Sequence, residues 1–360
     1  MHVLFVAPAH YEGDPARGTS FEYANFLPAL RGVAQRVELF DAVASAKEIG
    51  RVATGQRLMD RVKATQPDVM FTVLFQDELD PLAIEWISEQ TRTTTINWFC
   101  DDHWRFERYS RCWAPRFNHV VTTDADSLPK YARAGIEHVS LSQWACDTSV
   151  YKPVDGEGDY DYDVTFVGAA HGDRRKLVDG LRRRGIDVKC FGHGWPGGPV
   201  PLERMVEIFG RSRINLGFTA ASTSRRGLGT WLYDHTHRGV SQLPLLWRYR
   251  RAWRRACCGQ PPAQIKGRTF EVPACGGLML TEYAPHLDRY FDVDEEICVF
   301  KGVRDAARQI RELLADEPRR AAIAAAGHRR ALAEHTWEHR LAEVWRAAGV
   351  EASFTRREAA

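Results

Sequence analysis

The amino-acid sequence predicts an α/β fold of two Rossmann-like domains that face each other across a cleft, followed by C-terminal helices. With 360 residues, the chain is longer than one hydrophobic core usually fills. Its short apolar runs alternate with helix-like segments, which is typical of parallel strands covered on both faces. This alternation stops at a polar break over residues 153–162 and then begins again, which indicates a second unit of the same kind.

The first half is predicted to form one domain over residues 1–152. After a strand at His2–Val6, Thr19 or Ser20 is expected to cap a helix whose apolar residues recur at helical spacing. We expect further strands at 37–40, 68–74, 94–99, 120–123 and 138–141. Further helices are expected around 58–62, over 81–90, and from a cap at Asp126 to Gly135.

The second half is predicted to form another domain over residues 153–345, with a tail at 346–360. Its expected strands are 164–167, 188–191, 214–218, 278–280 and 297–300. Its expected helices are 174–183, 202–210, 266–274 and a helical region from Val303 onward. Because ligands of such sheets bind at the carboxyl ends of the strands, we expect the site at that edge.

Composition and charge indicate an ordinary globular protein of the cytoplasm. The formal net charge is +2, so the chain as a whole does not require a polyanionic partner. Eight scattered cysteines without a C-x-x-C pair are typical of reduced thiols. The N-terminus does not read as a signal peptide, and no apolar run is long enough to span a bilayer. We therefore expect a cytoplasmic protein, peripheral to the membrane if it meets one.

Five stretches carry a resemblance to a known family. They are residues 98–104 (WFCDDHW), 120–127 (VVTTDADS), 163–168 (DVTFVG), 264–282 (QIKGRTFEVPACGGLMLTE) and 327–340 (GHRRALAEHTWEHR). Over about 97–340 the chain thus resembles the CgeB-type (spore maturation protein) branch of the GT-B glycosyltransferases, which are glycosyl transferase group 1-like. The resemblance implies transfer of a sugar from a nucleotide diphosphate-sugar, UDP- or GDP-linked, to an acceptor hydroxyl. The acceptor (a glycan, a lipid-linked molecule or a secondary metabolite) and the oligomeric state stay open.

The resemblance places donor-binding residues in the stretch 264–282. Glu271 is implied to accept hydrogen bonds from the ribose hydroxyls, and such charge-assisted bonds are stronger than neutral ones. Lys266 and Arg268 precede it at the expected helix start, where cationic side chains and backbone N–H groups suit a diphosphate. The structural alternative is a surface glutamate beside two solvated basic residues.

Two glycine-containing turns are further candidates for donor contacts. Gly168 opens the loop GAAHGDR, which resembles a phosphate-facing loop and ends at Arg174, the implied ligand of the diphosphate. The resemblance also implies that the segment carrying Gly276, Gly277, Thr281 and Glu282 brings backbone amides near the diphosphate, which only small residues permit. A plain helix C-cap is the alternative for the two adjacent glycines.

Asp101 and His10 are the candidate catalytic residues. Asp101 follows the strand expected at 94–99, where a carboxylate suits a general base or a group that orients the sugar. Asp102 beside it fits a helix cap. His10 lies in the loop after the first strand. Many retaining GT-B enzymes carry two glutamates seven residues apart, but the first would fall on Ala263, so the stereochemistry stays open.

Two remaining features bear on metals and partners. Asp159, Asp161 and Asp163 form D-x-D-x-D, which we interpret as a solvated acidic linker rather than a metal site. Residues 219–262 carry eight arginines and three tryptophans against one aspartate, which predicts a surface for an anionic acceptor or partner. The alternatives to a glycosyltransferase are therefore a nucleotide-sugar epimerase on the same fold, or a non-catalytic nucleic-acid- or membrane-binding protein.

Overall fold

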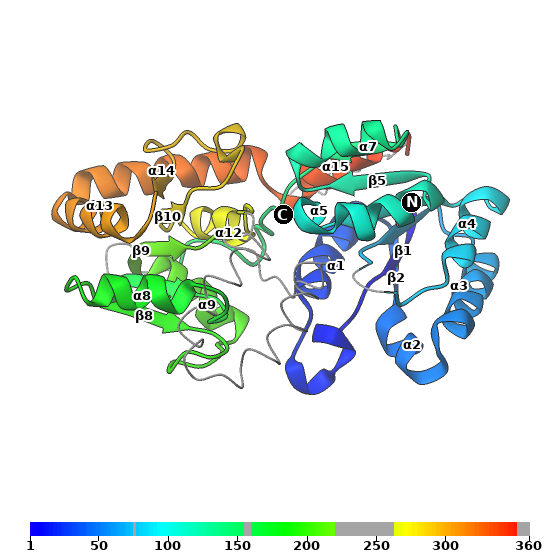
Figure 1. The fold of residues 1–360 in the computed structure, drawn as a ribbon, viewed down its shortest axis with the longest axis horizontal. Coiled ribbons are helices and arrows are strands. Elements are labelled where there is room, and N and C mark those ends of the chain that lie inside the picture. The colour runs from blue at the N-terminus through cyan, green and yellow to red at the C-terminus, as the bar shows by residue number, and fades with distance from the viewer. Residues whose placement is uncertain (75–76, 155–159, 220–262, 351–360) are drawn as a thin grey trace, which may run out of the picture.

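The computed structural model describes residues 1–74, 77–154, 160–219 and 263–350, and it confirms the predicted α/β fold. The described chain forms two parallel sheets, one of six strands in the N-terminal half and one of five in the C-terminal half. Helices pack beside each sheet, and the two units lie next to each other along the longest axis of the molecule (Figure 1).

The first sheet has the strand order β2-β1-β3-β4-β5-β6, and all its neighbours are parallel. Its strands are β1 (His2–Val6), β2 (Arg36–Phe40), β3 (Val69–Thr72), β4 (Thr94–Phe99), β5 (His119–Thr122) and β6 (Val139–Leu141). Its helices are α1 (Phe21–Val33), α2 (Ala42–Ile49), α3 (Arg51–Thr65), α4 (Pro81–Gln90), α5 (Asp102–Arg105), α6 (Ser110–Trp113) and α7 (Leu128–Arg133). Short 3-10 turns connect some of these elements.

The second sheet has the order β11-β10-β9-β7-β8 and is also parallel. Its strands are β7 (Tyr162–Val167), β8 (Val188–Phe191), β9 (Ser212–Gly217), β10 (Met279–Glu282) and β11 (Cys298–Phe300). The helices that follow are α8 (Arg174–Arg182), α9 (Leu202–Gly210), α12 (Arg268–Ala274), α13 (Val303–Ala315), α14 (Glu317–Glu334) and α15 (Trp337–Ala347).

Side-chain caps explain where several helices begin. Ser20 caps α1, because its Oγ accepts a hydrogen bond of 2.9 Å from the Tyr23 amide. Asp41 caps α2, a helix that we did not predict. The predicted cap at Asp126 is wrong: α7 follows Ser127 without a side-chain cap, and the Asp126 carboxylate instead pairs with His286 at 2.8 Å.

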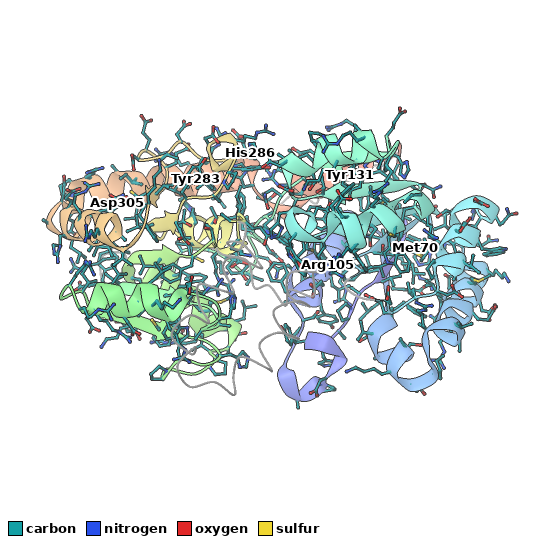
Figure 2. The ribbon with its side chains drawn as sticks, in the orientation of Figure 1. Met70, Arg105, Tyr131, Tyr283, His286 and Asp305 are labelled. Atoms are coloured by element: carbon teal, nitrogen blue, oxygen red, sulfur yellow. The ribbon has the colours of Figure 1, made fainter. Side chains whose placement is uncertain are left out.

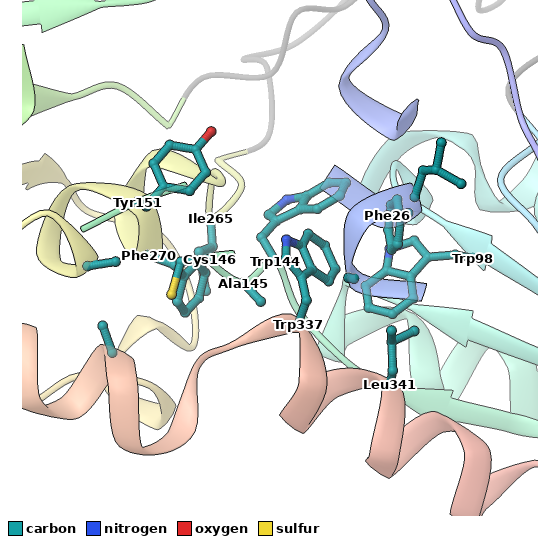
Figure 3. Packing of buried hydrophobic residues seen from close by; sticks show 14 of the residues in the cluster. Phe26, Trp98, Trp144, Ala145, Cys146, Tyr151, Ile265, Phe270, Trp337 and Leu341 are labelled. Atoms are coloured by element: carbon teal, nitrogen blue, oxygen red, sulfur yellow. The ribbon is translucent and has the colours of Figure 1, made fainter. Parts of the chain in front are cut away.

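The last helix returns to the N-terminal domain, which differs from the predicted domain limit at residue 345. The chain crosses between the domains where Cys146 pairs with Thr336 in an isolated parallel bridge. Trp337 then begins α15, which packs against α1. Its ring is fully buried, and the ring centroid lies 4.5 Å from that of Phe26 and 5.9 Å from that of Trp98 (Figure 3). This aromatic cluster holds the C-terminal helix on the first domain.

Some sequence predictions concern residues outside the described ranges. These are most of the basic insertion (220–262), Asp159, and the tail from residue 351. Of the acidic motif, Asp161 and Asp163 are described, and they lie 3.9 Å and 3.2 Å from Arg211 and Arg213, respectively. Among the described residues, no group of three or more His, Cys, Asp or Glu side chains is placed to hold a metal ion. None of the helices in these ranges combines the length and apolarity needed to cross a bilayer.

Replacing Gly327 by alanine tests the packing of α14 against the loop before β11. A Cβ at Gly327 would clash with the backbone carbonyl oxygen of Glu296, so the helix or the loop must shift. We expect Gly327→Ala to lower the free energy of unfolding by about 1–3 kcal/mol. Chemical denaturation measures this change.

Gly32→Ala is the matched control, because a Cβ at this exposed position of α1 meets one side-chain atom at 4.0 Å. It should leave stability unchanged or raise it by up to ~1 kcal/mol. Equal effects of the two substitutions would contradict the described contact of Gly327.

Candidate functional site

Basic side chains gather at the carboxyl edge of the second sheet. Arg174 begins α8 after the loop that leaves β7, while Lys266 and Arg268 lie at the start of α12. Arg174 is only 8% exposed, and its Nη1 donates to the Ala169 carbonyl at 2.9 Å. Its Nε is buried and finds no partner among the described residues. A buried donor without a partner is costly, so this position is suited to receive a ligand.

The electrostatics of these cations show that they lie close to one another. Burial lowers the pKa of Lys266 to about 8, an effect that Arg174 increases and Asp101 opposes. Burial also lowers the pKa of Arg174 to about 10, with a further contribution from Arg268. The pKa of His171 falls to about 4 through burial and the charges of Arg174 and Lys266. Such like-charge crowding favours binding of a polyanion.

Glu271 is fully buried within the same group, which excludes the alternative of a surface glutamate. Its Oε2 accepts a charge-assisted hydrogen bond from Arg268 Nη1. Its Oε1 is buried and has no partner among the described residues. The Tyr151 side chain also contacts the carboxylate, and burial together with this contact raises the pKa of the phenol well above its ordinary value. The site thus offers one hydrogen-bond acceptor without a described partner, Oε1, beside several hydrogen-bond donors.

Three other predicted residues lie at this edge of the sheet. A Cβ at Gly168 would stand 2.9 Å from the Phe166 ring and 3.4 Å from Arg174 Nη1, so this position has no room for a side chain. Thr281 is buried near the end of β10. Glu282 ends β10, and its Oε2 accepts hydrogen bonds from the Thr219 amide at 3.2 Å and hydroxyl at 3.3 Å.

Gly276 and Gly277 do not lie near the other residues that were predicted to bind the nucleotide-sugar. They precede β10 and therefore lie at the amino edge of the sheet, beyond the C-terminal end of α12. Gly276 has a φ of 74°, as a residue that terminates a helix often does. A Cβ at Gly277 would stand 2.6 Å from the Phe209 carbonyl oxygen. The geometry favours the helix C-cap and close packing over a phosphate contact.

Two carboxylates approach from the N-terminal domain. Asp101 follows β4 after one residue, Cys100, and burial raises its pKa, although Lys266 and Arg105 oppose this shift. Burial also raises the pKa of Glu22, in the first turn of α1. The negative charge of Asp101 raises this pKa further, whereas the hydrogen bonds that Glu22 receives lower it. We missed Glu22 in the sequence, because an acidic residue in a first helical turn is common for the helix dipole alone.

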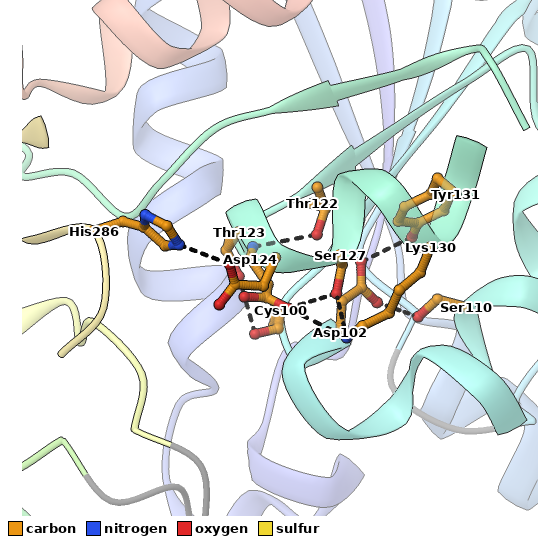
Figure 4. A network of polar contacts seen from close by, with 11 residues as sticks. Cys100, Asp102, Ser110, Thr122, Thr123, Asp124, Ser127, Lys130, Tyr131 and His286 are labelled. Atoms are coloured by element: carbon orange, nitrogen blue, oxygen red, sulfur yellow. Dashed lines mark hydrogen bonds and ion pairs between the residues drawn. The ribbon is translucent and has the colours of Figure 1, made fainter. Parts of the chain in front are cut away.

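Asp102 is not the helix cap that its position suggested. It is fully buried, and its two carboxylate oxygens accept hydrogen bonds from the Ser110 hydroxyl and, at 2.8 Å, from the Tyr131 hydroxyl (Figure 4). These bonds join α5 to α6 and α7. Asp102 therefore fixes the loop that carries Asp101.

His10 is not joined to the donor cations by any contact in the described part of the chain. Its backbone pairs with Thr19 in an isolated antiparallel bridge, so it belongs to the loop between β1 and α1. His103 lies nearer to the cations: burial lowers its pKa to about 3, with contributions from Lys266 and Lys130. The residues brought together are thus Arg174, Lys266, Arg268 and Glu271 from one domain, and Asp101 and Glu22 from the other.

Several contacts join the two domains at this place. The Gln264 side-chain amide donates to the Cys100 carbonyl at 2.6 Å. The ring of Phe21, at the start of α1, lies 3.5 Å from where a Cβ of Gly267 would stand. His286, which reaches Asp126, lies on the C-terminal domain at the boundary (Figure 2). The carboxyl edges of both sheets therefore meet in one region.

Comparisons with known proteins agree with this architecture. Residues 174–346 match a family model described as glycosyl transferase-like. The described fold is similar to a glycosyltransferase from Rickettsia africae (TM-score 0.60, 10% identity, 99% of each chain). It is also similar to HepE from Anabaena, solved with UDP-glucose (0.56, 13%, 98% of this chain and 100% of that chain). A third similar structure is sucrose-phosphate synthase from Thermosynechococcus elongatus (TM-score 0.58, 11% identity, 96% of this chain and 98% of that chain).

At these identities the solved structures establish the fold, which is that of the GT-B glycosyltransferases. The family model covers the second domain from Arg174 onward, and so includes Lys266, Arg268 and Glu271. No curated protein matches the chain by sequence.

Lys266→Met tests whether the cations are held close together at a cost in stability. Because the folded-state pKa of about 8 lies below the ordinary value of 10.5, folding disfavours the charged lysine. Below pH 8 the full penalty applies, and it disappears as the pH rises from about 8 to 10.5. At pH 7 the variant should be more stable than the wild type by about 1–3 kcal/mol, and this difference should shrink above pH 8.

Lys176→Met is the control for this measurement, because Lys176 lies exposed on α8 and, in the described part of the chain, pairs with the nearby Asp173. Denaturant unfolding at pH 7 and pH 9 measures both variants. A destabilised Lys266→Met, or an equal gain in the control, would contradict the described charge crowding.

Proposed function

We propose that this chain is a glycosyltransferase that moves a sugar from a nucleotide diphosphate-sugar to an acceptor hydroxyl between the two domains. One observation carries the proposal. Two buried side chains, Arg174 and Glu271, each leave a polar atom without a partner among the described residues, in a group of cations at the carboxyl edge of a parallel sheet. This is the edge where ligands of such sheets bind.

The donor is assigned to the C-terminal domain. Arg174 and Lys266 would hold the diphosphate, and the lack of a side chain at Gly168 lets the backbone lie close to Phe166 and Arg174. The free Oε1 of Glu271 would accept a hydrogen bond from a ribose hydroxyl, while Arg268 orients the carboxylate through its bond to Oε2. Complexes of HepE with UDP and with UDP-glucose favour a uridine nucleotide as the first candidate, with GDP as the second.

The cations supply the chemistry that this reaction needs. When the bond between the sugar and the diphosphate breaks, negative charge develops on the leaving phosphate oxygen. Arg174 and Lys266, which are already in place and mostly shielded from water, stabilise that charge. The proposal therefore includes transfer without a divalent metal ion, so that a chelator leaves the rate unchanged.

The acceptor would approach from the N-terminal domain. The charge of Asp101 acts on the pKa of Lys266, and the Asp101 carboxylate would orient the acceptor hydroxyl or take its proton. Whether the anomeric configuration is retained or inverted stays open in this proposal, as does the role of His10. The closer relation to the CgeB-type branch, and a peripheral place at a membrane, are also part of it.

The rival functions have less support. The matched family model and the similar structures are glycosyltransferases and a sucrose-phosphate synthase, so they do not favour an epimerase. A nucleic-acid- or membrane-binding protein depends on the arginines and tryptophans of 220–262, which lie outside the described residues. A nucleic-acid- or membrane-binding protein predicts no dependence of nucleotide binding on the cations described above, whereas an epimerase would convert the donor without any acceptor.

Binding of UDP tests the donor site directly. A nucleotide at one hundred times its Kd should raise the free energy of unfolding by about 2.7 kcal/mol. We expect UDP to raise the melting temperature of the wild type, and Arg174→Gln to weaken UDP binding about tenfold or more. Lys176→Gln on the same helix should bind UDP as the wild type does.

Several outcomes would contradict the proposal. One is the absence of a shift with UDP, GDP, TDP and CMP at millimolar concentration. Another is an equal shift in Arg174→Gln. Release of UDP from UDP-glucose in the presence of a chelator is the matching activity test, and its abolition by the chelator would contradict the metal-independent mechanism.

The pH dependence of UDP affinity gives a further test. Because burial holds the pKa of Lys266 near 8, its ammonium loses its proton as the pH rises through that value. UDP should therefore bind progressively more weakly from pH 8 to pH 9.5, by less than tenfold per pH unit, and Lys266→Arg should remove this dependence. Isothermal titration calorimetry measures both. A flat profile in the wild type would exclude Lys266 from the diphosphate site.

A further inference from the structure

The side chain of Gln264 bonds to both domains at once. Its Nε2 donates to the Cys100 carbonyl oxygen at 2.6 Å, across the domain boundary. Its Oε1 accepts from the Lys266 ammonium, also at 2.6 Å. One amide therefore connects the carbonyl just before Asp101 with the lysine assigned to the diphosphate.

The two partners fix the orientation of this amide. A backbone carbonyl only accepts hydrogen bonds, and an ammonium only donates them. The nitrogen of Gln264 must therefore face Cys100, and the oxygen must face Lys266. A glutamate can keep the second contact but not the first, and a leucine can keep neither. The residue type thus matches its position between two unlike partners.

Both ends of this connection are held independently by their own domains. The Cys100 carbonyl also accepts from the Thr123 hydroxyl at 3.1 Å, which fixes it to the first sheet. The backbone N–H of Gln264 donates a hydrogen bond to the Thr219 carbonyl oxygen at 3.0 Å. The backbone N–H of Thr219 in turn donates to the Glu282 carboxylate at the end of β10. Movement of one domain relative to the other therefore has to lengthen or break the Gln264–Cys100 bond.

We propose that Gln264 is a positioning residue that couples occupancy of the donor site to the placement of the Cys100–Asp101 segment of the other domain. This inference rests on the proposed function. The lysine ammonium has three donors, of which one is given to Gln264 Oε1. A bound diphosphate engages the others and fixes the lysine. The fixed lysine holds the Gln264 amide, which holds the carbonyl before Asp101.

The consequence is a response at a distance from the nucleotide. UDP contacts the C-terminal domain, but it should also reduce backbone opening over residues 99–106 of the N-terminal domain. By linkage, contact between the domains then raises the affinity for the donor. The acceptor side is thereby held more firmly when a donor is present, which limits exposure of the donor to water.

Hydrogen–deuterium exchange with and without UDP tests the coupling in the full chain. In the wild type, UDP should slow exchange at 168–176 and also at 99–106. In Gln264→Leu and Gln264→Glu at saturating UDP, slowing at 168–176 should persist, whereas slowing at 99–106 should fall at least threefold. Gln309→Leu is the matched control, since the Gln309 amide donates to the Val299 carbonyl at 2.8 Å within one domain.

The two variants also separate the ends of the amide. Gln264→Glu places a carboxylate against Lys266, so the pH at which UDP affinity begins to fall should move upward, which a loss of structure does not produce. The coupling would be overturned if UDP slowed exchange at 99–106 equally in the wild type and in both variants. It would also be overturned if UDP slowed exchange in the wild type at 168–176 but not at 99–106. Absence of slowing at 168–176 in the wild type would instead overturn the donor site.

Discussion

At the carboxyl edge of the second sheet, the described residues gather positive charge that they do not fully neutralise, and the rest of the candidate site depends on this constraint. Arg174, Lys266 and Arg268 lie close enough to perturb one another, and Glu271 is the buried carboxylate that pairs with one of them. Folding places these charges together against their repulsion, so packing elsewhere has to supply the free energy. The diphosphate that we propose as the ligand would remove the imbalance.

The packing that supports this arrangement joins the two domains. The chain enters the second domain after Cys146 and leaves it at Thr336, and these two segments pair with each other. α15 then places Trp337 in a cluster with Phe26 and Trp98 of the first domain. The two segments that cross between the domains thus lie side by side. At another place, the Gln264–Cys100 hydrogen bond joins the carboxyl edges of the two sheets. The proposed donor and acceptor sides are therefore held in one place by contacts that lie outside the proposed chemistry.

The sequence was sufficient to predict the fold and to predict which residues of the candidate site lie together. Runs that are apolar throughout and alternate with helical spacing identify buried parallel strands, and β1, β4, β8, α4 and α9 were predicted to the residue. The resemblance of the stretch 264–282 was enough to group Lys266, Arg268 and Glu271, and position in a strand–turn–helix unit was enough to place Arg174 at the same edge, since the carboxyl edge of a parallel sheet is fixed by topology. Their role in binding a nucleotide stays a prediction.

The remaining features depend on contacts between segments far apart in the chain, which local pattern does not contain. Glu22 looks like an ordinary first-turn acid until α1 is placed beside Asp101, and Gln264 looks like any polar loop residue until Cys100 lies against it. Gly276 and Gly277 were associated with the diphosphate by their closeness in sequence to Glu271. Topology places them at the opposite edge, because α12 runs antiparallel to β10. The return of α15 to the first domain is likewise a property of packing.

A crystal structure of the chain with UDP tests the central claim most directly. The account predicts a diphosphate within hydrogen-bond distance of Arg174 and Lys266, and a ribose hydroxyl at Oε1 of Glu271. A nucleotide bound elsewhere, for example in the hollow of about 310 Å³ lined by Glu85, Ser88 and Arg116 on the N-terminal domain, would contradict it. So would UDP at the second sheet with Glu271 Oε1 still unpartnered and Lys266 turned away from the phosphates.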